Sequence, residues 1–350
     1  VVGVFRGTGI IDDNLWFMTL RAGGVANVHG LFKLIPALIL LPCAGLFAKV
    51  AERLVPDQPE DPEDTMIKES IKQLDLRLIT NPRIALGETH SMTSNMFEVS
   101  LHNYTACIQQ MYEYDPKRNE RMNQREDMID MMTDVADKYV VEISPHITLD
   151  YDDRYQSFLM KGLVSIERIG DLAINIMQSI INMKSEDVQF SNVAMAELRV
   201  LMTAVNDILE MTADAYKEKS HSMAQRIEPL EEVIDELVDK VRRRHMWRMK
   251  HNLCEVVRGI SFQNIIQNLE RISDQCSDLG VNILGLEDES INGNEHQYLR
   301  DIHHSDDPLY NRLFAKYKAK YMGVLDSIAV DSVNGNEEEV EKQLKLDIEI

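Results

Sequence analysis

Acidic residues four positions apart recur in this sequence, and paired carboxylates at that spacing are a metal-binding arrangement. On an α-helix, positions i and i+4 share a face, with a rise of about 6 Å between them. The string ERI-x-D occurs twice, about a hundred residues apart, and each copy has a second acidic pair upstream. The pairs are Glu126 with Asp130, Glu167 with Asp171, Glu231 with Asp235, and Glu270 with Asp274. The repeat indicates a duplicated structural module that carries two carboxylate pairs on two different helices of each unit.

Two interpretations of these acids are open. Most helix carboxylates form a solvated stripe, which would give these residues no function. Apolar neighbours such as Ile166, Ile169 and Ile272 argue against this, because they leave little of the ERI-containing helices plainly polar. If two such helices pack antiparallel, like charges about 4 Å apart repel by about 4 kcal/mol at an effective dielectric near 20. The cluster must then protonate, open or bind cations, and Mg²⁺, Mn²⁺, Ca²⁺ or Fe³⁺ suit oxygen ligands better than zinc or copper.

Composition favours an all-α protein and excludes several functions. The 350 residues include only 16 Gly and 6% aromatic residues, and their net charge of −21 argues against nucleic acid as a partner. The four cysteines form no paired spacing, as expected of core residues in a reducing compartment. Glu218 and His221 form a single ExxH motif, whereas ferritin-type carboxylate enzymes need two on facing helices. With no phosphate loop or nucleophile motif either, we expect that the protein is not an enzyme.

Helical periodicity from residue 66 onward predicts two three-helix units. We place domain boundaries at 67–190 for the first bundle, 191–290 for the second, and 291–350 for a C-terminal helix and an acidic tail. The expected helices span about 83–113, 120–143, 154–183, 193–220, 224–250, 255–285 and 308–330. Residues 291–307 are expected to be a loop, and its HHSDD string, though able to bind a metal, has no partners in the sequence.

The front of the chain, residues 1–54, contains a hydrophobic segment at about 22–48. Its uncharged stretch is shorter than the roughly 20 residues that usually span a bilayer, but small flanking residues extend it. Two prolines disfavour a buried core helix, so we predict membrane insertion. Lys49 and Arg53 follow at once, which places residues 55–350 in the cytoplasm. Residues 55–66, rich in proline and acids, are predicted to be a linker.

The strings ERIGDLAINI (167–176) and ERISDQCSDLGVNI (270–283) resemble the signature of the PhoU domain, a pair of three-helix bundles. Residues 25–42 are similar to the last membrane segment of bacterial type II sodium–phosphate cotransporters, many of which end in a PhoU-like domain. Residues 74–88 resemble the connector between the two parts. No QSSS-like string of the transport core occurs, so the chain is interpreted as the C-terminal part of such a cotransporter and could not transport phosphate by itself.

The resemblance implies a metal-binding regulatory domain of a sodium-dependent phosphate transporter at the bacterial inner membrane, with bound Mg, Mn or Fe. The alternative is a soluble PhoU-type adaptor that acts on a separate phosphate transporter or sensor kinase. The expected partners are the transport core, membrane lipid and metal ions, with a homodimer left open. The implied metal ligands are Glu126, Asp130, Glu167, Asp171, Glu231, Asp235, Glu270 and Asp274, with Asp278 as an additional candidate because unit one has Asn175 there.

A basic, amphipathic island, RRRHMWRMK (242–250), interrupts this acidic sequence, and the first unit has nothing like it at the matching place. One interpretation is docking on anionic lipid head groups or on the transporter's inner face. The other is a helix C-terminus whose arginines complement the helix dipole. The candidate docking residues are Arg242, Arg243, Arg244, Trp247, Arg248 and Lys250.

Overall fold

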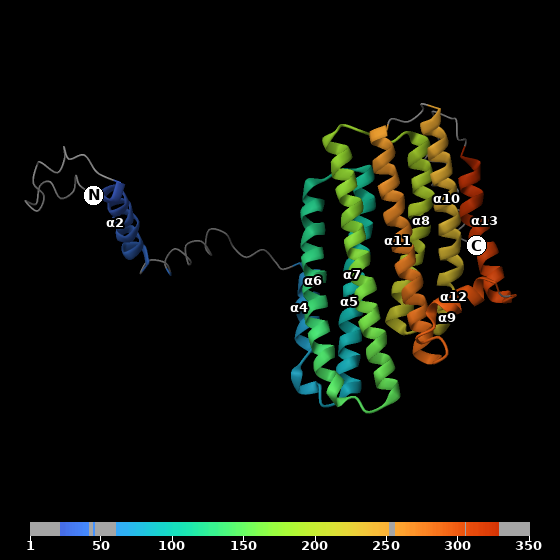
Figure 1. Cartoon of the computed structure of the whole chain (residues 1–350), viewed down its shortest axis with the longest axis horizontal. Coiled ribbons are helices and arrows are strands. Elements are labelled where there is room, and N and C mark those ends of the chain that lie inside the picture. The colour runs from blue at the N-terminus through green and yellow to red at the C-terminus, as the bar shows by residue number, and fades with distance from the viewer. Residues whose placement is uncertain (1–21, 42–44, 46–60, 252–255, 305, 329–350) are drawn as a thin grey trace, which may run out of the picture. The chain divides into compact units, whose positions relative to one another are not determined.

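The computed structural model describes residues 22–41, 45, 61–251, 256–304 and 306–328, and the chain divides into two units, residues 1–61 and 62–350 (Figure 1). The first unit contains helix α2, Ala22–Leu40, with Pro36 inside it. Several of its apolar side chains, including Phe32 and Leu38, are exposed. Among the described residues, no helix is both long enough and apolar enough to cross a membrane. The predicted membrane segment at 22–48 runs beyond the described ranges and stays a prediction.

The second unit confirms the all-α prediction, since its described residues contain helices and turns but no strand. Its helices are α4 Pro62–Gln73, α5 Pro82–Tyr112, α6 Pro116–Ile143, α7 Asp150–Ser185, α8 Asn192–Glu218, α9 His221–Ala224, α10 Ile227–Lys250, α11 Val256–Glu287, α12 Glu295–His303 and α13 Pro308–Ser327. Short 3₁₀ turns occupy Leu76–Leu78 and Ser144–His146.

Local sequence signals set several helix starts. Asp115 caps α6 by accepting a hydrogen bond from the Lys117 backbone N–H at 2.9 Å, and a proline follows it. Ser191 caps α8 in the same way, and Asp307 caps α13. A capping side chain satisfies a backbone N–H that has no partner inside the helix, and proline at the first position loses no helical hydrogen bond. These caps fix where each long helix enters the bundle.

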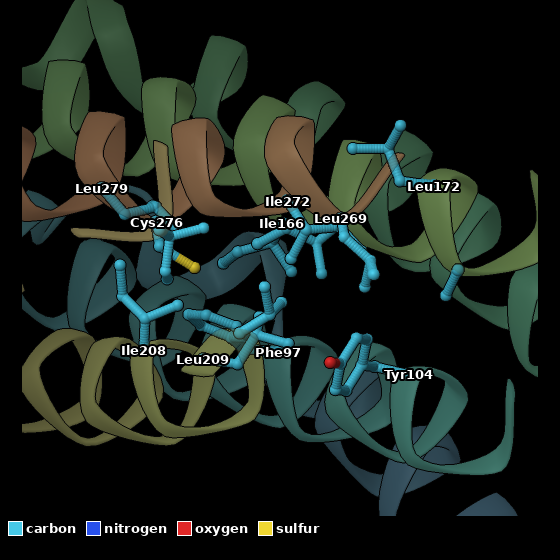
Figure 2. Close-up of a cluster of buried hydrophobic side chains, with 14 of the residues drawn as sticks. Phe97, Tyr104, Ile166, Leu172, Ile208, Leu209, Leu269, Ile272, Cys276 and Leu279 are labelled. Carbon is cyan, nitrogen blue, oxygen red and sulfur yellow. The ribbon is translucent and has the colours of Figure 1, made fainter. Parts of the chain in front are cut away.

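The long helices lie side by side (Figure 1), and the two predicted triplets share one compact unit. Helices α5, α6 and α7 pack on one another, as do α8, α10 and α11, while α7 packs against α11 and α5 against α8. The triplets therefore meet through four helices. Figure 2 shows the buried side chains there, which include Phe97, Tyr104, Ile166, Ile208, Leu209, Leu269, Ile272, Cys276 and Leu279. This shared core holds the first and third helices of the two triplets together, and the second helices α6 and α10 pack on them.

One further helix flanks each triplet, and two predictions about these regions were wrong. Helix α4 packs on α5 and α6, and its first turn occupies residues 62–66, which were expected to be linker. Pro62 suits a helix start, and acids in the first turn favour the positive end of the helix dipole. In 291–307, expected to be a loop, α12 forms over Glu295–His303. Helix α13 then packs on α10 and α8 and ends close to the predicted 308–330. The predicted tail beyond residue 328 lies outside the described residues.

Candidate metal centre

The first carboxylate cluster lies between α6 and α7. Glu126 and Asp130 come from one turn of α6, and Asp171 faces them from α7. One carboxylate oxygen of each lies within 4.8 Å of the other two. Partial burial, followed by the charges of Asp130 and Asp127, raises the pKa of Glu126. Partial burial and the charge of Asp130 likewise raise the pKa of Asp171. We call this group the first triad; its carboxylates repel one another across the helix seam.

The second cluster repeats this arrangement between α10 and α11. Glu231 and Asp235 lie on α10 and Asp274 on α11, again with one oxygen each within 4.8 Å of the others. Glu231 is buried, and desolvation together with the neighbouring acids raises its pKa to about 10. Desolvation by the surrounding helices and the facing acids raise the pKa of Asp235 to about 7 and that of Asp274 to about 6. This second triad is more deeply buried than the first and more strongly strained by like charge.

The remaining predicted ligands lie outside the triads. Burial, with Asp171 as the next contributor, raises the pKa of Glu167, but its oxygens fall outside the 4.8 Å group. Glu270 instead accepts a hydrogen bond from Arg242 Nη2 at 2.9 Å. Asp278 also stands apart: Gln275 Nε2 lies 3.4 Å from its Oδ2. Of the nine predicted ligands, six thus converge, three in each triad.

An additional group borders the second triad and was not among the predicted ligands. Glu228 is buried, accepts a hydrogen bond from the Ser277 hydroxyl, and lies 2.6 Å from His303 Nε2. The other ring nitrogen of His303 is 3.5 Å from Glu232. The hydrogen bond with Glu228 raises the pKa of His303. The HHSDD string was the only sequence signal, and its partners became visible only once α12 packed beside α10.

The basic island divides into buried and exposed parts. Arg244 and Arg248 are buried around the fully buried Glu197, at 2.9 Å and 2.6 Å respectively, so neither can contact lipid. Arg244 also donates to the backbone carbonyls of Leu325 and Ile328 at the end of α13. With Arg242 paired to Glu270, the exposed remainder of the predicted docking set is Arg243, Trp247 and Lys250.

The donor set of each triad fits a hard cation. Carboxylate oxygens are the preferred ligands of Mg²⁺, Mn²⁺ and related ions, and no thiol or imidazole belongs to either triad. Three acids with oxygens within 4.8 Å of one another repel, and protonation, side-chain rotation or a shared cation relieves that repulsion. The raised pKa values of Glu231 and Asp235 indicate that these acids hold protons more tightly than usual. A bound cation would relieve the same repulsion without a proton. Each triad also retains solvent access through its exposed aspartates.

Comparison with known proteins identifies the helical body. Residues 198–283 match the model of the PhoU domain family. A curated relative from Thermotoga maritima, "Phosphate-specific transport system accessory protein PhoU homolog 1", is 24% identical over 178 residues, 51% of this chain and 75% of that protein.

Two crystal structures share the fold. PhoU from Pseudomonas aeruginosa has a TM-score of 0.54 and 19% identity, covering 57% of this chain and 96% of that one. The phosphate transport system regulatory protein PhoU from Streptococcus pneumoniae also has a TM-score of 0.54, with 17% identity, covering 60% of this chain and 98% of that one. Residues 198–283 thus match the PhoU domain family, and the helical body that contains them shares its fold with these two PhoU structures.

Proposed function

We propose that this chain is a PhoU-type accessory protein that regulates phosphate transport and binds hard metal ions at its two triads. The names of its relatives support the first half, since the Thermotoga protein is described as an accessory protein and the Streptococcus protein as a regulatory protein of a phosphate transport system. The chain's strong negative charge would repel phosphate from its surface, which a bound cation would offset locally.

The convergence of two equivalent triads carries the metal proposal. The same residue types, at the same spacing, approach one another on equivalent helices of both triplets. Glu126, Asp130 and Asp171 would hold one ion or ion cluster, and Glu231, Asp235 and Asp274 the other. A bound cation would neutralise the acids and link the second helix to the third. For regulation, a partner or ligand must bind the metal-loaded and metal-free states with different affinities.

Elemental analysis of the full chain tests this proposal. The variant Asp235→Asn/Asp274→Asn removes two charges from the second triad with little change in side-chain volume. We expect it to retain the metal of the first triad and lose that of the second. Asp239→Asn, on the same helix but outside the triad, is the control and should keep full metal content. Equal metal content in all three proteins, with unchanged far-UV circular dichroism, would reject the ligand assignment.

A finer proposal concerns the attachment of this body to a membrane. We propose that residues 1–54 are the end of a sodium–phosphate cotransporter-like part and that the helical body regulates it from the cytoplasmic side of the bacterial inner membrane. The apolar composition of 22–48 and the exposed apolar side chains of α2 support this. A soluble adaptor that acts on a separate transporter or sensor kinase remains the alternative. Fractionation decides: recovery of folded full-length chain in the aqueous extract, with none in the membrane pellet, would favour the adaptor.

A further inference from the structure

The solvent-facing side of the last turns of α10 presents a basic and apolar stripe. Arg243, Met246, Trp247 and Lys250 are spaced i, i+3, i+4 and i+7, so they share one face of the helix. All four are exposed, Met246 by 58% and Trp247 by 40%. The opposite face contains the buried Arg244 and Arg248, and it anchors the helix to the core. We call these four exposed residues the α10 stripe.

The side-chain chemistry of the α10 stripe is unlike that of an ordinary solvated surface. Within the part of the chain that the structure describes, neither Met246 nor Trp247 belongs to the hydrophobic core, and the Trp247 ring stacks on that of His251 with 4.1 Å between ring centroids. Arg243 is 72% exposed, and its ion pair with Asp239 is long, at 3.7 Å. Tryptophan flanked by arginine and lysine is typical of helices that lie in a membrane interface, where the ring and the charges are both accommodated.

The first triplet provides an internal comparison. At the equivalent positions, 105 residues earlier, α6 has Lys138, Val141 and Glu142, and Pro145 lies in the 3₁₀ turn that follows. Val141 is equally exposed, but an acid replaces the tryptophan and a proline replaces the terminal lysine. Lys138 keeps a basic residue at the position of Arg243, so the side chains that the shared fold does not require are Trp247 and Lys250. Helix packing therefore does not explain why these side chains occur on α10 and not on α6.

Charge determines the kind of surface that the α10 stripe fits. The whole chain carries a net charge of −21, so an anionic bilayer repels most of its surface. Of the six lysine and arginine residues from Lys240 to Lys250, the exposed ones are Arg243 and Lys250, which both belong to the α10 stripe. We propose that the α10 stripe docks this end of the helical body on an anionic lipid surface, with Trp247 and Met246 inserted at the head-group level and Arg243 and Lys250 contacting lipid phosphates. This proposal does not depend on metal binding at the triads.

Vesicle binding by the full chain tests the proposal, with Trp16→Phe as the background so that Trp247 is the single tryptophan. With vesicles of phosphatidylglycerol and phosphatidylcholine, Trp247 emission should shift to the blue and be quenched by brominated lipid. Each basic residue near such a surface contributes about a fivefold gain in partitioning, so Arg243→Glu/Lys250→Glu should weaken binding by about 25-fold or more. Binding through the apolar α2 segment would persist in this variant and on phosphatidylcholine alone.

The control variant is Arg312→Glu/Lys316→Glu, which reverses two exposed basic residues on α13. It should bind the anionic vesicles as the parent chain does. The proposal is overturned if both double variants lose binding equally, because that would indicate general electrostatics. It is also overturned if Trp247 emission does not change on vesicles. Loss of a concentration-dependent dimer in the α10 variant, with lipid binding intact, would assign the stripe to a second copy of the chain instead.

Discussion

In the metal-free protein, Glu231→Gln should increase stability near neutral pH, although Glu231 belongs to the proposed site. Glu231 is 8% exposed, and desolvation and its acidic neighbours raise its pKa from the ordinary 4.5 to about 10. Between these two values the unfolded chain releases the proton while the native state retains it. Stability therefore falls as pH rises through this window, because the native state binds more protons than the unfolded state. Glutamine has no proton to lose and removes the penalty.

The magnitude follows from the size of that window. At pH 7, about 2.5 pH units above the ordinary pKa and at about 1.36 kcal/mol per unit, the penalty is at most about 3 kcal/mol. Repulsion is shared among the coupled carboxylates of Glu231, Asp235 and Asp274, so Glu231→Gln removes only part of it. We expect this variant to raise the free energy of unfolding by about 1–3 kcal/mol near pH 7 and hardly at all near pH 4. Added Mn²⁺ should reverse the order of stabilities, since the ion binds the native carboxylates of the parent chain.

Urea denaturation followed by far-UV circular dichroism measures this difference, first with chelator and then with Mn²⁺. Glu98→Gln is the control: Glu98 forms an exposed pair with Lys217 at 3.2 Å, and its loss should change stability by less than about 1 kcal/mol at either pH. The reasoning is refuted if Glu231→Gln is as stable as the parent, or less stable, in chelator near pH 7. That result would mean that the native site does not strain this carboxylate.

Further predictions concern the core and can be measured by the same denaturation assay. Glu197→Ala leaves two buried guanidinium groups without their carboxylate and should cost about 3–5 kcal/mol. Gly162→Ala should cost about 1–3 kcal/mol, because its Cβ would lie 2.6 Å from the Tyr216 hydroxyl oxygen, whereas Gly87→Ala, with nothing within 4 Å, should be neutral or stabilising. Cys276 is fully buried and burial raises its pKa to about 12, so a thiol reagent should modify it in urea but not in the native protein; rapid native modification would contradict the packing.

Much of the fold could be predicted from the helical spacing of apolar residues and from the prolines and capping residues at helix ends. The predicted helix at 120–143 is α6, Pro116–Ile143, and the predicted 255–285 is α11, Val256–Glu287. Apolar side chains at helical spacing are local information, and the flanking prolines and capping residues are read directly from the chain. The short α12 was missed because its nine residues contain few apolar side chains and no buried residue. Such a helix depends on what it packs against.

The candidate site was only partly predictable for a related reason. Spacing on a single helix places Glu270 and Asp274 on one face, but it does not say which one joins the acids of α10 and which one pairs with Arg242. Packing directs Asp274 to the triad and places Arg242 beside Glu270. Likewise, the basic island gave no indication that Arg244 and Arg248 would be buried around Glu197, which lies on another helix.

The sequence by itself determined the long helices, their duplication and the acid pairs, because these depend on residues a few positions apart. Tertiary structure alone decided which carboxylates converge, that His303 lies beside the second triad, and which basic side chains remain exposed on α10. Each of these results depends on distances between helices far apart in the chain. Those distances are fixed by packing of the shared core, to which all of its apolar side chains contribute together.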